Sequence, residues 1–431
     1  MDLRSLAVLG ALAFFSVKAF KNPYIAVLLM TWLGYMNPHR LAGYWSVAYN
    51  MPLYAVITAL TMGLTIKALS AKQVRFPSIG FIGFLLILFI IWLGITTLLA
   101  QHPEVATQGY TRFLKIQLSI LLTLLLIDDE KKLKLLIWVI FGSIGYFGVK
   151  GGVFSLTSGG GHRVWGPPST FIEGNNELAL ALIMILPLGY FLFQNVSNKW
   201  VKRALLGSLG LMVISILASY SRGALLALAC TGFFLWLKSS KKLPVAAMVI
   251  LTVLVLIPFM PEQWFDRMDT IETYEEDASA MGRINAWEMA TNLAKDRLTG
   301  GGFNTWSYEM FALYAPNPTN VLDAHSIYFE VLGEHGFPGL LLFLLIFISS
   351  WFKASALTRQ AKDHDELAWI GQLMPMCQVS LVAYASGGAF LGLAFFDLPY
   401  HIIAIIIICT TIVARHKKTS ADSRLPGSIR H

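Results

Sequence analysis

Long apolar runs alternate with short polar segments along nearly the whole chain. A helix needs about 20 mainly apolar residues to cross the ~30 Å hydrocarbon core of a bilayer. Lipid cannot satisfy an open backbone, which favours helices for such runs. The pattern predicts an all-α polytopic integral membrane protein with about 12 transmembrane helices. The apolar runs lie at 3–17, 23–36, 48–66, 78–100, 113–127, 133–149, 177–194, 204–220, 222–237, 243–260, 336–352, 367–388 and 398–414.

Composition supports the same class. The 431 residues are 56% hydrophobic and 13% charged, whereas soluble proteins carry roughly 25% charged residues. The net charge of +8 does not indicate nucleic-acid binding, because the lysine and arginine residues lie in short loops and at the C-terminus. Cys230, Cys377 and Cys409 fall inside apolar runs, where we expect them to be small buried hydrophobes.

The distribution of lysine and arginine predicts the orientation. Basic residues collect in every second loop, and such loops face the cytoplasm. The alternation predicts four regions: N-terminal transmembrane helices with an outer loop at 150–176, an outer helical segment, C-terminal transmembrane helices and a basic cytoplasmic tail. Their bounds are 1–260, 261–335, 336–414 and 415–431. Residues 3–17 and 23–36 are short, so they form either one broken span or two.

Two outer segments are unusual. Glycines and prolines fill 150–176 and predict irregular structure there. Within 261–335, apolar residues at helical spacing predict an amphipathic helix over 283–294. A second helix is expected from near Asp323 to Gly336, where Pro338 leads into the next span.

Three arginines are candidate anion-binding groups. Arg222 interrupts the apolar stretch 204–237, which must turn back near it at the outer surface. The alternative for Arg222 is a side chain that binds lipid headgroups. Arg283 begins the amphipathic helix. There its side-chain charge and the free backbone N–H groups of the first helical turn could bind the same anion. Its alternative is a salt bridge to the acidic run 272–277. Arg163, in the glycine-rich loop, is the third candidate.

His325 is the candidate base. It follows Asp323 near a predicted helix start, and a histidine can take a hydroxyl proton near neutral pH. Asp323 could orient it, although such a histidine can also simply cap or pack. His335 and Arg297 are expected to interact with helix C-terminal dipoles. The outer segments have no metal-ligand motif, so we expect no metal and no cofactor.

Taken together, these segments resemble the O-antigen ligase family, which shares a Wzy-like carboxyl-terminal region. The matching pieces are Ser-Tyr-Ser-Arg-Gly at 219–223, Gly-Arg-Ile-Asn-Ala-Trp at 282–287, Gly-Gly-Gly-Phe-Asn at 300–304 and the stretch 324–339 that begins Ala-His-Ser. Upstream, Arg-Val-Trp-Gly at 163–166 and Asn-Asn at 175–176 are similar to an earlier outer-loop element. Ser326 departs from the pattern, since many members have asparagine after the histidine.

The resemblance implies a membrane glycosyltransferase similar in architecture to the GT-C type. It implies transfer of a preassembled glycan from undecaprenyl pyrophosphate to a hydroxyl of lipid A–core, with inversion and without metal. The site would face the periplasm from the bacterial inner membrane. The implied roles are catalysis for His325 and pyrophosphate binding for Arg222, Arg283 and Arg163. Asp323 and Asn176 would support them.

Three alternatives remain open from the sequence. An O-antigen polymerase would use the same donor to lengthen a lipid-linked chain, and a protein O-oligosaccharyltransferase would use a protein acceptor. A lipid or solute transporter would need repeats or broken helices with polar groups near the midplane. Product chemistry separates the first two from a ligase.

Overall fold

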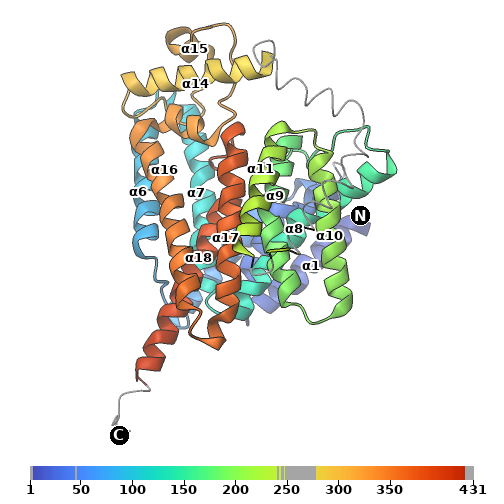
Figure 1. Cartoon of the computed structure of the whole chain (residues 1–431). Coiled ribbons are helices and arrows are strands. Elements are labelled where there is room, and N and C mark those ends of the chain that lie inside the picture. The colour runs from blue at the N-terminus through green and yellow to red at the C-terminus, as the bar shows by residue number, and fades with distance from the viewer. Residues whose placement is uncertain (1–2, 44–45, 240–241, 244–246, 248–277, 423–431) are drawn as a thin grey trace.

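The computed structural model describes residues 3–43, 46–239, 242–243, 247 and 278–422, and in this part of the chain it contains helices and no strand. Figure 1 shows the long helices side by side as a bundle. The helices in chain order are α1 (Leu3–Ala19), α2 (Tyr24–Met36), α3 (Pro38–Leu41), α4 (Val47–Asn50), α5 (Leu53–Ser70), α6 (Gly80–Leu98), α7 (Pro103–Leu126), α8 (Glu130–Thr157), α9 (Asn175–Asn195), α10 (Lys199–Leu217), α11 (Arg222–Lys238), α14 (Ala278–Asp296), α15 (Tyr308–Tyr314), α16 (Ile327–Gln360), η2 (Asp365–Leu367), α17 (Ala368–Gly387), η3 (Gly388–Phe390) and α18 (Asp397–Asp422).

Nine helical segments in the described residues are long and apolar enough to cross a membrane. The protein is therefore a polytopic helical membrane protein. The segments are α5 to α10, α16, the segment containing α17, and α18. Two further predicted spans, α1 and α11, have 17 residues each, and α2 has 13. The first two runs form two separate helices. The expected span 243–260 lies mostly outside the described residues, so the count of about 12 stays a prediction.

The apolar helices divide into central and peripheral ones. In α9 and α18, 72% and 78% of the most apolar window is buried, but only 22% in α10. Helices that are apolar all round belong in the interior of a bundle or in lipid. Along α6, large apolar side chains recur every three or four residues on an exposed stripe, as expected of a lipid-facing surface. They are Phe81, Phe84, Ile87, Ile91 and Ile95.

The helices α14 and α15 form a cap at one end of the bundle (Figure 1), and the C-terminal end of α18 lies at the opposite end. The predicted amphipathic helix 283–294 lies within α14. Its buried face includes Ala286, Met289 and Leu293, which pack against Met310 and Phe311 of α15. This small core holds the two cap helices together.

The cap is hydrogen-bonded to α16 through the glycine triplet after α14. The backbone N–H of Gly301 donates to the carbonyl of Gly333 at 2.9 Å, and that of Gly302 donates to the carbonyl of Glu334 at 2.8 Å. Gly300 and Gly302 have φ of 63° and 87°, a region that glycine enters without strain. The triplet therefore lets the chain turn and press its backbone against α16.

The prediction that 150–176 is irregular throughout was wrong for its first part. Helix α8 continues to Thr157. Gly152 lies where a Cβ atom would collide with the backbone carbonyl of Leu211 in α10. Small residues let helices in a membrane approach closely. Here the glycines serve helix packing and do not end the helix.

The second outer helix also begins later than predicted. Helix α16 starts at Ile327, after Ser326, and not near Asp323. The expected break at Gly336 is confirmed, because this residue has φ 66° and ψ −173° inside the helical segment. The kink divides α16 into a short outer part and a long apolar part.

Candidate functional site

Arg222 lies at the first position of α11, directly after the turn from α10. The Ser221 hydroxyl accepts a hydrogen bond from the N–H of Ala224 at 3.1 Å and caps the helix. Tyr220, in the turn, has φ 56°. The predicted reversal near Arg222 is thus present, and the cap places this partly buried arginine at the positive end of the helix dipole.

The outer loop that carries Arg163 packs on the same turn. The N–H of Val164 donates to the carbonyl of Ala218 at 3.0 Å. Asn175, at the start of α9, donates from Nδ2 to the carbonyl of Ser219 at 2.7 Å. Its neighbour Asn176, the predicted supporting residue, is partly buried beside it. The structure therefore brings the segments of Arg163, Asn176 and Arg222 together, and Asn175 makes the direct contact.

Tyr220 links the two segments a second time. Its hydroxyl donates to the carbonyl of Gly160 at 2.5 Å, and the Arg163 guanidinium lies 6.0 Å from its ring centroid. Partial burial raises the pKa of Tyr220, and the positive charge of Arg163 lowers it to a smaller extent. The tyrosine therefore keeps its proton near neutral pH and can act as the donor.

Arg283 and His325 lie on segments that α14 holds together. The indole Nε1 of Trp287, one helical turn after Arg283, donates to the carbonyl of Ala324 at 2.7 Å. Asn285 donates from Nδ2 to the carbonyl of Asn320 at 3.0 Å. These bonds fasten the extended segment before His325 along α14, with Arg283 and Trp287 at i and i+4 on one face of the helix.

His325 has an uncommon backbone conformation. Its φ of 44° lies in the left-handed region, which costs a residue with a side chain free energy and recurs at functional sites. Its Nδ1 lies 3.1 Å from the backbone carbonyl of Asp323. The main chain of Asp323 thus orients the imidazole, where the sequence suggested its carboxylate. Because a carbonyl oxygen only accepts, Nδ1 carries the proton and Nε2 presents a lone pair.

The segment 388–396, which consists of η3 and the loop before α18, lies between the Arg222 region and the His325 region of the candidate site. A Cβ atom on Gly223, next to Arg222, would lie 3.3 Å from Cβ of Phe390. A Cβ atom on Gly392 would lie 3.9 Å from the backbone nitrogen of His325. The loop spans 388–396 and contacts both ends of the site, yet its apolar sequence carried no functional signal.

Glu330, like the 388–396 loop, was not identified from the sequence. Its Oε2 accepts a hydrogen bond from the N–H of Ala394 at 2.9 Å, which fastens the 388–396 loop to the first turn of α16. An acidic residue in the first turn of an apolar helix was the one available signal. Glu330 lies five residues after His325 and holds the loop beside it.

His335 is not the helix-end partner that we expected. It is completely buried, and Nδ1 lies 2.7 Å from the hydroxyl of Thr96 in α6. Arg297 donates from Nε to the carbonyl of Gly300 at 3.1 Å and from Nη2 to that of Leu99 at 2.7 Å. His335 therefore joins α16 to α6 within the bundle, and Arg297 joins the end of α14 in the cap to the end of α6.

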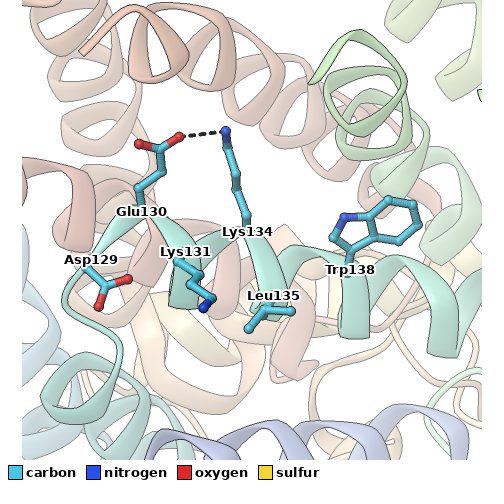
Figure 2. A pocket seen from close by; sticks show the side chains of 6 residues that line it. All are labelled: Asp129, Glu130, Lys131, Lys134, Leu135 and Trp138. Carbon is cyan, nitrogen blue, oxygen red and sulfur yellow. Dashed lines mark ion pairs between the residues drawn. The ribbon is translucent and has the colours of Figure 1, made fainter. Parts of the chain in front are cut away.

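A hollow of about 530 Å³ lies at the other end of the bundle, where α8 begins. Figure 2 shows the ion pair on its wall between Glu130 and Lys134, at 2.6 Å. Nearby, Arg415 of α18 donates to the carbonyl of Asp128 at 3.3 Å. This hollow belongs to a loop predicted to be cytoplasmic and is remote from the cap, so it is not part of the candidate site.

In the described part of the chain, no three His, Cys, Asp or Glu side chains gather as a metal site would require. Independence of metal stays a prediction for experiment.

Comparison with known proteins gives two family matches. Residues 207–344 match the O-antigen ligase family. Residues 3–197 match a family of unknown function (DUF5935). No curated protein matches the chain.

The O-antigen ligase match contains Arg222, Arg283 and His325 and so covers the centre of the candidate site. Arg163 and Asn176 lie in the other matched region. The resemblance predicted from the sequence is confirmed. Residues 207–344 of this multi-pass membrane protein thus match the O-antigen ligase family, which points to a membrane enzyme of glycan transfer.

Proposed function

We propose that the protein transfers a preassembled glycan from undecaprenyl pyrophosphate to a hydroxyl of lipid A–core, at the periplasmic face of the bacterial inner membrane. The family match supports the reaction class, and the apolar helices supply the environment for a lipid-linked donor. The cap and the α10–α11 turn carry the candidate polar side chains, and the apolar 388–396 loop contacts the segments of both Arg222 and His325.

The orientation of His325 carries the proposal. With Nδ1 held by the carbonyl of Asp323, Nε2 takes the proton of the acceptor hydroxyl. The acceptor oxygen then bonds to the anomeric carbon of the donor glycan. The bond from that carbon to the pyrophosphate oxygen breaks, and its electron pair leaves with the lipid pyrophosphate. One displacement inverts the anomeric configuration and leaves the proton on His325.

Arg222 and Arg283 stabilise the leaving group in this proposal. Charge grows on the pyrophosphate as the bond breaks, and preorganised positive groups lower the barrier to that step. A guanidinium can hold two phosphate oxygens at once, which a lysine cannot. Arg222 also starts α11, so the helix dipole adds to its charge. Arg163 and Asn176 support Arg222 through the packed outer loop.

The reaction is tested with purified protein, lipid-linked glycan and lipid A–core, without metal or nucleotide. Ligation appears as an upward shift of lipid A–core on a gel. We expect transfer to persist in EDTA, because the donor pyrophosphate supplies the energy. Turnover that is lost in EDTA and restored by magnesium contradicts the metal-free mechanism. Longer glycan still on the lipid carrier identifies a polymerase, and glycan on protein identifies a protein O-oligosaccharyltransferase.

Variants test the assigned roles. His325→Ala should lower single-turnover transfer by about 10²–10⁴-fold, the usual loss for a general base, and leave donor binding unchanged. Arg222→Ala and Arg222→Lys should both weaken donor binding. His364→Ala, in a predicted cytoplasmic loop, is the matched histidine control and should behave as wild type. Transfer at the wild-type rate by His325→Ala removes the histidine from the mechanism.

A further inference from the structure

A groove of about 430 Å³ runs along the outer face of α14. The opposite face of this helix packs against α15, as described above, so the groove lies on the face turned away from the cap core. The residues that line the groove follow one another at helical spacing along α14, and the last of them belongs to α16. The residues that matter here are Trp287, Glu288, Thr291, Asn292, Lys295 and Phe329.

Two stacked aromatic rings form the floor of the groove near the candidate site. The rings of Trp287 and Phe329 lie 4.8 Å apart between centroids and 7° from parallel, and both are partly exposed. Trp287 is also the residue whose indole binds the carbonyl of Ala324, next to His325. The groove therefore adjoins the segment that carries the proposed base.

Polar groups line the rest of the groove. The Asn292 side chain donates to the carbonyl of Tyr314 at 3.0 Å, and its own carbonyl oxygen is left to accept. Thr291 donates to the carbonyl of Trp287 at 2.7 Å and likewise keeps acceptor capacity. Glu288 and Lys295 are exposed on the same stripe and carry opposite charges. The lining therefore has no net charge.

We propose that this groove binds a sugar of the acceptor glycan and directs its hydroxyl toward His325. A sugar ring presents weakly positive C–H groups, which suit the negative face of an aromatic ring. Its hydroxyls both donate and accept, which suits the Glu288, Asn292 and Lys295 side chains. An anionic lipid surface would instead favour several cations. The inference rests on the proposed function, because it assigns the acceptor half of that reaction.

The first experiment separates acceptor from donor. We expect the double variant Glu288→Gln with Asn292→Ala to raise the KM for lipid A–core roughly tenfold, since two hydrogen bonds are weakened. The kcat and the KM for the lipid-linked donor should change little. Glu104→Gln, an exposed glutamate at the start of α7, is the matched control. An unchanged KM for lipid A–core overturns the proposal, and so does a rise confined to the donor.

The second experiment does not depend on turnover. Core oligosaccharide released from lipid A by mild acid is titrated calorimetrically into the full-length protein in detergent. The wild type should bind it, and the double variant and Phe329→Leu should bind it more weakly. If the wild type binds but transfers no glycan, the proposed function fails and the groove stands. Short-chain phosphatidylglycerol is titrated in the same way. If the variants bind this lipid more weakly but bind the oligosaccharide as the wild type does, the groove is a lipid contact and the proposal is overturned.

Discussion

Replacing Glu334 with alanine should loosen the cap from the bundle. Glu334 is buried in the outer part of α16, and its Oε1 accepts hydrogen bonds from the N–H of Asn304 at 2.8 Å and from Nε1 of Trp306 at 3.2 Å. Alanine leaves both donors without this acceptor. Asn304 is exposed and Trp306 is half-buried, so water can partly replace the lost acceptor, and the loss is close to the net contribution of two hydrogen bonds, about 1–3 kcal/mol.

Glutamine at the same position is a sharper control than a distant substitution. It keeps an acceptor for Asn304 and Trp306. Thr96 donates to the carbonyl of Leu93 at 3.0 Å and so accepts from Nδ1 of His335. The lone pair on Nε2 of His335 then lies 3.7 Å from Oε2 of Glu334, where a glutamine amide could donate to it.

We therefore expect Glu334→Gln to match or exceed the wild-type stability, and Glu334→Ala to lose about 1–3 kcal/mol. The free energy of unfolding is measured in mixed micelles of a mild detergent and SDS. Transfer should fall in the alanine variant alone, because the cap carries Arg283. Equal stability of the two variants would refute the reasoning, since it would mean that the Oε1 hydrogen bonds contribute nothing.

Three further substitutions test the packing around the site. Ser221→Ala removes the N-cap of α11 and should cost about 0.5–2 kcal/mol in the same unfolding assay, with weaker donor binding. Tyr220→Phe loses the hydrogen bond to the Gly160 carbonyl and should cost about 1 kcal/mol; faster proteolysis of the outer loop would report the loss, and an unchanged digestion pattern would contradict it. Gly152→Val should give little monodisperse protein, because the new side chain collides with the Leu211 carbonyl; normal size-exclusion profiles would show that α8 and α10 can separate.

The fold class was predictable because bilayer thickness and helical periodicity act on local sequence. The stripe over 283–294 predicted α14, and the long apolar runs predicted the spans that are described. Boundaries that depend on tertiary contacts were not predictable. The glycines near Gly152 look like helix breakers until α10 is placed against them. The start of α16 moved to Ile327 because His325 takes a left-handed conformation that no local pattern reveals.

The sequence singles out the candidate residues of the site one by one, but it does not reveal how they are arranged. Arg222 is conspicuous in an apolar stretch, and His325 is conspicuous at a predicted helix start. The 388–396 loop between them is apolar and has no local signature, so its role follows only from the fold. Glu330 was hidden for the same reason, since its partner Ala394 is 64 residues away.

The kink at Gly336 has a consequence for how the enzyme tolerates different membranes. The outer part of α16 is tied to the glycine triplet of the cap, and the remainder is an apolar span that adjusts its tilt to bilayer thickness. We expect a change in tilt to be absorbed at the kink, where Gly336 already departs from helical backbone angles. His325 should thus keep its distance from the cap in thin and thick bilayers alike, so that lipid chain length affects substrate access more than the geometry of the proposed proton transfer.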